Sequence, residues 1–318
     1  MRWGIVGCGT IAREFAEDLE KSHGAQLVAV ASRSAAKAEA FADEFHCDRS
    51  YGSYAALYAD PAIDIVYVAT PHSEHLRNSA DAMMAGKHVL CEKPLTATLD
   101  EARELVALHK QSGVYLMEAM WSWFLPAVRH ALRWLDEGRI GKLVHLKADF
   151  GYPQRYDPLL RMYSPELGGG ALLDMGVYPV ALSWLLRRQQ PTSIMAVGRM
   201  APNGVCDDLS VLMDYGSYTA TIGTSFRAKL QNWAYIIGTE GYIAIPDYWR
   251  AREAKLYVLD TCVDSFVDNR NERGFVHEIA AVMSDIAEGR TQSPICSLAD
   301  SVAVQVLMAN IQSAVQPH

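Results

Sequence analysis

A glycine turn directly behind a short apolar run constrains this chain more than any other feature of its sequence. The apolar run is Trp3–Val6, and the turn that follows it reads Gly7-Cys8-Gly9-Thr10-Ile11-Ala12. In a GxGxxA turn the first glycine permits a tight bend, the second lets a pyrophosphate approach the backbone, and the small third residue lets helix pack on strand. The free N–H groups of the helix behind it attract the phosphates. We therefore predict a cofactor-binding turn formed by Gly7, Cys8, Gly9, Thr10 and Ile11.

The first 120 residues alternate short apolar runs with segments of helical spacing. We expect strands at Trp3–Val6, Leu27–Ala31, Ile65–Ala69, His88–Leu90 and Val114–Met117. Helices are expected between them, at Ile11–Lys21, Ala35–Phe45, Glu74–Ala85 and Leu99–Gln111. Such alternation is typical of βαβ units on a parallel sheet with helices on both faces. The prediction for residues 1–120 is an NAD(P)-binding Rossmann domain of the α/β class, built on a doubly wound parallel sheet.

The pattern changes behind Trp121. A helix is expected at Ala127–Glu137, a strand near Lys142–Phe150, and another helix from Gly168-Gly169-Gly170 onward. Strand-like runs joined by short turns, which favour antiparallel pairing, follow at Ser193–Met200, Leu209–Tyr215, Tyr218–Arg227, Trp233–Gly238 and Tyr242–Pro246. Two more helices are expected at Val276–Ala287 and Leu298–Val315. We predict an α/β domain over residues 121–318 with a large open, mainly antiparallel sheet.

Charge and cysteine usage restrict the partners of this chain. The net charge of −8 argues against a nucleic-acid or anionic-membrane binder, because both favour clustered Lys and Arg. No apolar run reaches the roughly 20 residues of a membrane helix, and the longest, Ala171–Leu186, is interrupted by Asp174 and Pro179. The six cysteines form no CxxC pair and no cluster with His, so we expect reduced thiols and no metal. A cytoplasmic protein with small-molecule partners is expected.

The end of the second expected strand discriminates between cofactors. An acidic residue there hydrogen-bonds the ribose 2′-hydroxyl of NAD, whereas this chain has Ser32-Arg33-Ser34, with Lys37 one helical turn further. An Arg fork and a hydroxyl suit a 2′-phosphate. We predict NADP(H), with NAD(H) possible, bound by Ser32, Arg33 and Lys37. The alternative is an exposed Arg beside a serine that caps a helix.

Two further motifs carry groups suited to chemistry. Cys91-Glu92-Lys93-Pro94 ends the strand expected at His88–Leu90, at the edge of the sheet where ligands of doubly wound folds bind. Asp174 and Tyr178 stand at i and i+4, on one face of a helix, so they can serve one site, although a buried structural tyrosine explains Tyr178 equally well. A carboxylate in an apolar helix is costly to bury without a partner. A polar pocket is therefore expected at Asp174.

These motifs together resemble the Gfo/Idh/MocA family, named for glucose-fructose oxidoreductase and inositol dehydrogenase. The resemblance rests on the N-terminal turn, on Glu92-Lys93-Pro94 and on the stretch from Gly168 to Tyr178. The segment Met117-Glu118-Ala119-Met120-Trp121, followed by Phe124 and Pro126, is similar to the dihydrodiol and xylose dehydrogenase branch. The resemblance implies a Rossmann domain and an α/β domain whose open sheet mediates contacts in a homodimer or homotetramer.

The resemblance also implies roles for individual residues. Lys93 matches the family's catalytic lysine, and Asp174 with Tyr178 matches its Asp-x3-His pair, with Tyr as in the dihydrodiol branch. The nicotinamide loop corresponds to the segment Thr70-Pro71-His72-Ser73-Glu74-His75, and the cofactor residues implied with it are Thr70, Pro71, His75, Glu92 and Lys93. Two positions depart from the pattern. His72 replaces a more usual Asn, and Trp123 replaces an Arg common in the branch.

The implied reaction transfers hydride between nicotinamide C4 and a CH–OH or C=O group of a sugar, polyol or cyclic diol. Tyr178 would take the hydroxyl proton, with Lys93 as the cation that favours its phenolate. Trp121, Phe150, Tyr152 and Trp249 are expected to offer a substrate ring an apolar face, although ordinary packing explains any single one equally well. Two alternatives stay open: an NAD-dependent glycosidase of the same fold, and a non-catalytic regulator that senses a ligand.

Overall fold

The computed structural model describes residues 1–317 and divides the chain into two compact units. The first unit comprises Met1–Trp121 and Asn271–Val302, and the second comprises Ser122–Arg270 with the chain from Ala303 onward. The sequence placed everything behind residue 120 in one second domain, so the return of Asn271–Val302 is a difference from that expectation.

A buried carboxylate accounts for this return. Asp18, near the end of helix α1 (Thr10–Leu19), accepts the backbone N–H groups of Gly274 at 2.8 Å and of Phe275 at 2.9 Å. These N–H groups belong to the start of helix α8 (Phe275–Ala287), which has no side-chain cap of its own. Helix starts leave N–H groups without partners, and an acidic side chain there stabilises them. A contact so distant in sequence leaves no local pattern.

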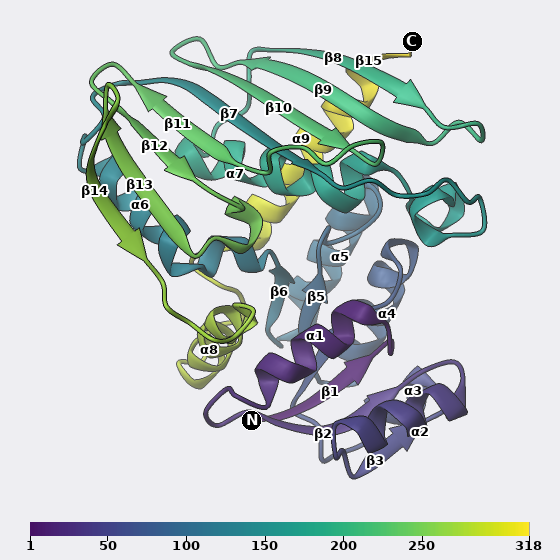
Figure 1. Cartoon of the computed structure of the whole chain (residues 1–318). Helices are drawn as coiled ribbons and strands as arrows, with labels where there is room; N and C mark the ends of the chain where they lie inside the picture. Colours follow the sequence, from purple (N-terminus) through teal and green to yellow (C-terminus); the bar gives the residue numbers. More distant parts are fainter. Residues whose placement is uncertain (318) are drawn as a thin grey trace. The chain divides into compact units, whose positions relative to one another are not determined.

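The first unit is built on a six-stranded parallel sheet in the order β3-β2-β1-β4-β5-β6 (Figure 1). Its strands are β1 (Arg2–Val6), β2 (Gln26–Ala31), β3 (Arg49–Tyr51), β4 (Ile65–Val68), β5 (His88–Glu92) and β6 (Leu116–Ala119). The other helices are α2 (Ala35–Glu44), α3 (Tyr54–Tyr58), α4 (His75–Met84) and α5 (Leu99–Ser112). The predicted Rossmann fold is confirmed. Strand β3 and helix α3 were missed because both are short.

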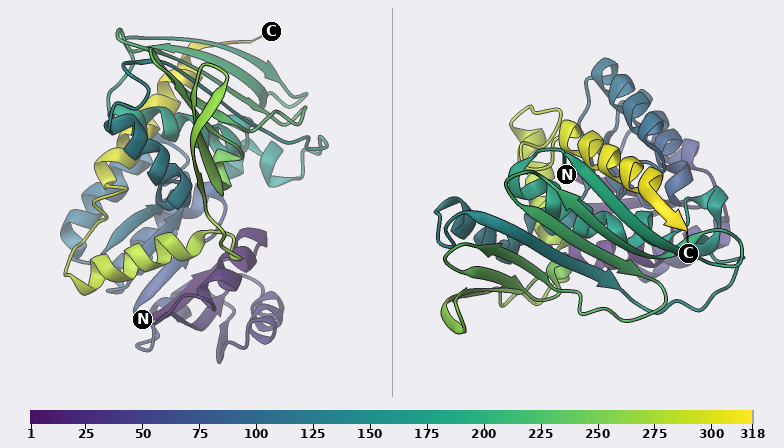
Figure 2. Two further views of the ribbon diagram at one scale, coloured as in Figure 1. Left: turned by 60° about the vertical axis from the view of Figure 1, so that its left-hand side comes forward. Right: turned by 90° about the horizontal axis from the view of Figure 1, so that it is seen from above.

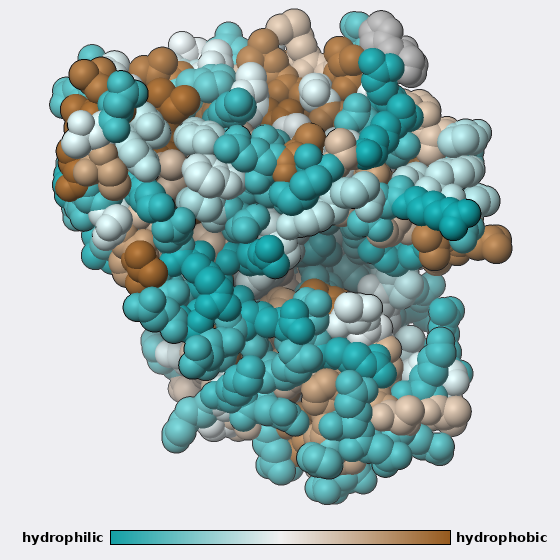
Figure 3. All heavy atoms as spheres, in the orientation of Figure 1, coloured by the Kyte–Doolittle hydropathy of each residue, from teal (hydrophilic) through white to brown (hydrophobic). Residues whose placement is uncertain are grey.

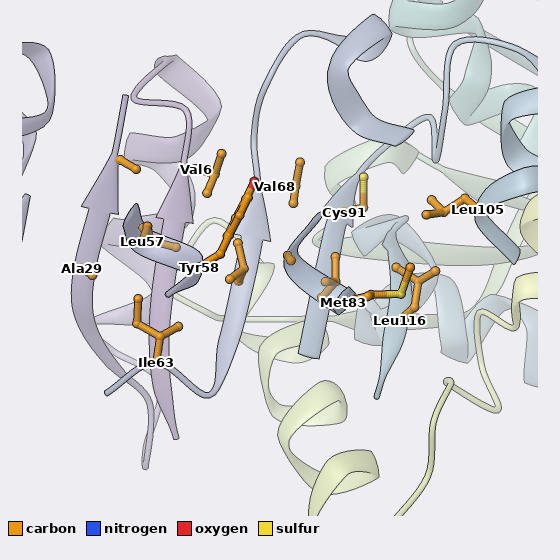
Figure 4. Close-up of a cluster of buried hydrophobic side chains, with 14 of the residues drawn as sticks. Val6, Ala29, Leu57, Tyr58, Ile63, Val68, Met83, Cys91, Leu105 and Leu116 are labelled. Atoms are coloured by element: carbon orange, nitrogen blue, oxygen red, sulfur yellow. The ribbon is translucent and has the colours of Figure 1, made fainter. Parts of the chain in front are cut away.

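The core of the first unit lies between this sheet and its helices. Figure 4 shows side chains of β1, β2, β4, β5 and β6 meeting residues of α3, α4 and α5, such as Tyr58, Met83 and Leu105. All residues of β4 are buried, as expected for a parallel strand covered on both faces. The sheet therefore presents only its edges and strand ends to a ligand.

The second unit contains a nine-stranded sheet in the order β14-β13-β12-β11-β7-β10-β9-β8-β15. Within residues 1–317, only β7–β10 and β8–β15 pair in parallel, so the predicted mainly antiparallel sheet is confirmed. The strands are β7 (Leu143–Gly151), β8 (Ser193–Met200), β9 (Cys206–Asp214), β10 (Thr219–Ser225), β11 (Ala234–Gly238), β12 (Tyr242–Ile245), β13 (Glu253–Val258), β14 (Thr261–Val267) and β15 (Val315–Pro317). The last three were not predicted.

Helices cover one face of this sheet and leave the other bare (Figure 2). They are α6 (Pro126–Asp136), α7 (Val177–Arg187) and α9 (Leu298–Ala314), of which α9 begins in the segment assigned to the first unit. On the bare face Met195 and Val197 are 63% and 48% exposed. Figure 3 shows further apolar side chains at the surface near β13 and β14, where Val263 and Val267 are exposed.

One helical stretch of the described chain, Pro165–Arg187, is long and apolar enough to cross a membrane by length and composition alone. In this structure 72% of its most apolar window is buried inside the protein. A buried core helix passes the same test, and α7 packs on β7 and β10. The stretch is therefore explained by packing against the sheet.

Candidate active site

The glycine turn behind β1 has the geometry that a phosphate needs. Gly7 has φ +95°, and a Cβ there would lie 2.6 Å from the carbonyl oxygen of Ala69. Gly9 is different, because a Cβ on it would meet no atom within 4 Å. Packing therefore requires glycine at position 7, whereas the space over Gly9 is open. Helix α1 starts directly behind Gly9 without a side-chain cap, so its first N–H groups point to the same place. The turn fits a pyrophosphate.

The other residues predicted in this turn differ in exposure. Thr10 is exposed, and Cys8 and Ile11 are half-buried. The Cys8 thiol lies 3.7 Å from the carbonyl oxygen of Ala31 and donates to it. Burial raises the pKa of the Cys8 thiol to about 11, so this sulfur is a neutral thiol near pH 7. Cys8 therefore contributes backbone and shape to the turn rather than charge.

Two serines shape the turn behind β2. The Ser32 hydroxyl accepts the N–H of Ser34 at 3.3 Å, and the Ser34 hydroxyl accepts the N–H of Lys37 at 3.4 Å, which caps α2. Arg33 and Lys37 are exposed, and within residues 1–317 neither lies at ion-pair distance from a carboxylate. Burial raises the pKa of Tyr54 while the neighbouring Arg33 opposes that rise. Two cations thus stand at the predicted phosphate position.

His75 connects two loops at the carboxyl edge of the parallel sheet. Its Nδ1 lies 2.9 Å from the carbonyl oxygen of Pro94, and its Nε2 lies 2.9 Å from that of Thr70. The ring is fully buried, as Thr70 nearly is. The imidazole therefore joins the loop behind β4 to the Lys93-Pro94 turn behind β5. His75 can therefore influence a bound cofactor through these two loops.

Buried carboxyl groups hold the Lys93 turn from two sides. Glu92 accepts the hydroxyl of Tyr67 and, at 3.1 Å, the N–H of Lys93. Glu118 on β6 accepts the N–H of Leu95 at 2.9 Å. Burial raises the pKa of both carboxyl groups, and Lys93 opposes this rise. Glu92 thus shapes the turn through buried hydrogen bonds, while Lys93 itself is half-buried. The role of Glu118 was missed, although a Glu inside an apolar run was a visible signal.

In the second unit, Asp174 lies in a π-helical turn (Leu172–Gly176) that leads into α7. Its Oδ1 lies 2.6 Å from Nη2 of Arg161, and their side chains are 12% and 35% exposed. This carboxylate therefore has a charged partner, while the expected polar pocket at Asp174 stays a prediction. Arg161 was missed as that partner, because it begins a separate, single-turn 3₁₀ helix (Arg161–Tyr163) and no periodicity connects it to Asp174.

Aromatic rings gather around Phe150, at the end of β7. Trp249 stacks on Phe150 with centroids 4.8 Å apart, and Tyr178 and Tyr152 approach it edge-on at 5.4 and 5.8 Å. The structure thus brings most of the predicted apolar face together with Tyr178. Trp121 belongs to the first unit, where its ring stacks on Phe275 at 4.6 Å. Phe275 was not singled out by the sequence.

A parallel sheet in this strand order, with a glycine turn behind its first strand, defines a dinucleotide-binding α/β protein. The oxidoreductase family model with NAD-binding Rossmann fold, GFO_IDH_MocA, matches residues 1–120, and the GFO/IDH/MocA C-terminal domain model matches residues 128–244. The chain belongs to the Gfo/Idh/MocA family of oxidoreductases, and its first unit is an NAD(P)-binding domain. The predicted resemblance and the prediction of an enzyme are confirmed.

Relatives with full-length similarity agree with this assignment. The trans-1,2-dihydrobenzene-1,2-diol dehydrogenase of Mus musculus is 36% identical over 99% of this chain and 97% of its own length. A 3-ketoreductase from Actinomadura kijaniata, solved with NADP and TDP-benzene, superimposes with a TM-score of 0.89 at 28% identity, over 100% of this chain and 98% of that chain. An aldose-aldose oxidoreductase from Caulobacter crescentus has a TM-score of 0.90 at 22% identity, over 99% and 97%, and shows the same fold.

Proposed function

We propose that this enzyme is an NADP(H)-dependent dehydrogenase that acts on a CH–OH or C=O group of a sugar, polyol or cyclic diol. The observation that carries the proposal is the placement of Tyr178 among the rings of Phe150 and Trp249, one turn behind the ion-paired Asp174. A hydroxyl group at the edge of an apolar ring cluster suits a substrate that offers C–H surface and a hydroxyl together.

The cofactor proposal rests on Arg33 and Lys37. Both are exposed cations without a carboxylate at ion-pair distance in the described chain, and Ser32 lies beside them. A 2′-phosphate would gain charge-assisted hydrogen bonds from the Arg fork. The relative from Actinomadura kijaniata was solved with NADP, which supports the same preference. When bound, the nicotinamide ring supplies or accepts hydride at C4. Lys93, at the carboxyl end of β5, is proposed to bind the nicotinamide ribose.

We assign the proton of the substrate hydroxyl to Tyr178. A free tyrosine has a pKa of about 10, so acid–base duty near neutrality requires a cation that favours the phenolate. Lys93 is proposed in that role, and Asp174 is proposed to orient the substrate. The names of the dihydrodiol dehydrogenase relatives support a cyclic diol as one substrate. The rings of Phe150, Tyr152 and Trp249 support a stacked sugar equally well.

The proposal also includes a homodimer or homotetramer formed through the bare face of the nine-stranded sheet. A shallow hollow of about 500 Å³ on this sheet is lined by Met195, Val197 and Leu212 among others. Contiguous exposed apolar surface of this kind commonly marks a protein interface. Light scattering of the native enzyme and of Val197→Lys tests it, because a buried lysine should shift the enzyme to monomers.

A substrate screen tests the proposed reaction. Pentoses, hexoses, inositols, trans-dihydrodiols and nitrophenyl glycosides are incubated with NADP⁺ or NAD⁺, and the absorbances of the reduced cofactor and of released nitrophenol are followed. Turnover of at least one class, with NADP⁺ preferred, is expected. Net cleavage of a glycoside with no net change in cofactor absorbance would favour the glycosidase alternative instead.

A further inference from the structure

Arg161 is a charged group that the structure pairs with Asp174, and it begins a short 3₁₀ helix (Arg161–Tyr163) between β7 and α7. Its Nη2 lies 2.6 Å from Asp174 Oδ1, a distance typical of a charge-assisted hydrogen bond. Asp174 stands in an apolar helical segment in which Leu172 and Met175 are buried. A carboxylate in such a place is stabilised in its ionised form by a guanidinium and destabilised by burial.

The turn that carries Arg161 is seated on a glycine of the Gly168-Gly169-Gly170 run. A Cβ on Gly169 would lie 2.8 Å from the carbonyl oxygen of Arg161 and 2.7 Å from that of Ser164. The N–H of Gly169 donates to Ser164 at 2.8 Å, and the N–H of Gly170 donates to Met162 at 2.9 Å. Glycine at position 169 is therefore required because the Arg161 turn lies directly against its Cα.

Tyr163 anchors the same turn to the body of the second unit. Its ring is buried and meets Phe226 edge-on at 5.6 Å, and its hydroxyl donates to the carbonyl oxygen of Gln154 at 3.0 Å. Asn203 donates to its carbonyl oxygen at 2.5 Å. These contacts fix the backbone two residues behind Arg161, so the guanidinium is delivered from a rigid turn rather than from a free side chain.

We propose that Arg161 is a positioning residue that keeps Asp174 ionised and in one orientation, one turn ahead of Tyr178. Gly169 serves the same purpose, because it admits the turn that delivers the guanidinium. The inference deepens the proposed function, on which the active-site role of Asp174 and Tyr178 rests. Arg161 acts through Asp174 in this account.

Variants of Arg161 test the inference against a matched control. Arg161→Gln removes the charge, Arg161→Lys keeps a charge without the fork, and Arg155→Gln removes an exposed arginine of the same segment between β7 and α7. We expect Arg161→Gln to lower kcat by about 10- to 100-fold, since small misplacements of reacting groups cost that much. Arg161→Lys should recover part of this loss, and Arg155→Gln should keep the wild-type kcat.

A double-mutant cycle separates positioning from general destabilisation. In an Asp174→Asn background, adding Arg161→Gln should lower kcat further by less than about twofold, because the side chain at position 174 is already neutral. An undiminished loss in that background would overturn the inference. So would wild-type kcat in Arg161→Gln.

A readout independent of turnover keeps this inference distinct from the proposed function. The carboxyl group of Asp174 is titrated by NMR in protein labelled with carboxyl-¹³C aspartate, and Asp174→Asn identifies its signal. Its pKa should rise in Arg161→Gln by about one to three pH units, and less in Arg161→Lys. An unchanged pKa of Asp174 in both variants would refute the pairing of Arg161 with Asp174. If the pKa of Asp174 rises in Arg161→Gln but the wild-type enzyme turns over none of the screened substrates, the proposed function alone is refuted.

Discussion

The imidazole Nδ1 of His75 lies 2.9 Å from the carbonyl oxygen of Pro94, across two strand ends of the parallel sheet. The opposite ring nitrogen faces the carbonyl oxygen of Thr70 at the same distance. Two loops implied in nicotinamide binding are thus held by one buried side chain. Removing a donor from a buried carbonyl costs about 1–3 kcal/mol.

His75→Leu should therefore lower the thermal stability of the first unit and weaken NADPH binding by about tenfold, since about 1.4 kcal/mol corresponds to that factor. Differential scanning calorimetry and a fluorescence titration with NADPH measure the two effects. His23→Leu, on the surface of the same unit, is the control and should change neither. Full NADPH affinity in His75→Leu would show that the two loops keep their geometry without the imidazole.

Asp18 should be one of the most sensitive positions for folding. Its buried carboxylate accepts three backbone N–H groups, those of Arg273, Gly274 and Phe275. Asp18→Ala leaves them without an acceptor, and a loss of about 3 kcal/mol or more is expected. The thermal midpoint should fall by roughly 6–12 °C for a domain of this size. Glu20→Ala, exposed at the end of the same helix, should leave the midpoint unchanged.

Arg33→Gln tests the cofactor preference. Loss of one charge-assisted contact to a phosphate should raise the Kd for NADPH by about 10- to 100-fold and leave that for NADH within about twofold. Titrations at one fixed ionic strength measure both constants, because salt screens exposed charges. Arg77→Gln on α4 removes another exposed arginine and serves as the control. An equal rise in the Kd values for NADPH and NADH would show that Arg33 does not bind the 2′-phosphate.

Tyr178→Phe keeps the ring that packs on Phe150 and removes only the hydroxyl. We expect kcat to fall by about 10²- to 10⁴-fold, the usual range for a lost acid–base group, with unchanged cofactor binding. Steady-state kinetics and an NADPH titration provide the two values. Tyr156→Phe, at an exposed tyrosine outside this ring cluster, is the matched control. Near-normal turnover in Tyr178→Phe would remove Tyr178 from the proposed mechanism.

Cys8 gives a prediction about pH. Because burial raises its pKa to about 11, only about a thousandth of this thiol is ionised at pH 8. Alkylation by iodoacetamide at pH 8 should label the exposed Cys262 long before Cys8, as peptide mass spectrometry can show. The raised pKa stabilises the fold below the unfolded value near 9, and this contribution disappears as the pH rises from 9 to 11. Rapid labelling of Cys8 at pH 8 would contradict the assigned burial.

Local patterns were sufficient for much of this protein. The strand and glycine turn up to Ala12 are contiguous, so they predicted the phosphate position, and the alternation of apolar runs with helical segments behind them predicted the parallel sheet. The spacing of Asp174 and Tyr178 likewise lies within one helical turn. Alternating runs along β8 to β12 predicted the antiparallel sheet, whereas β13 and β14, with weaker signals, were missed.

Only the tertiary structure decided which distant groups meet. Arg161 stands 13 residues before Asp174, Leu95 stands 23 before Glu118, and Asp18 stands 257 before Phe275. Hydrophobic periodicity and turn chemistry act over a few residues. The sequence by itself therefore determined most helices and strands, the glycine turn and the side chains that are candidates for catalysis. The tertiary packing determines which groups pair with a buried charge, because desolvation makes an unpaired buried charge costly in free energy.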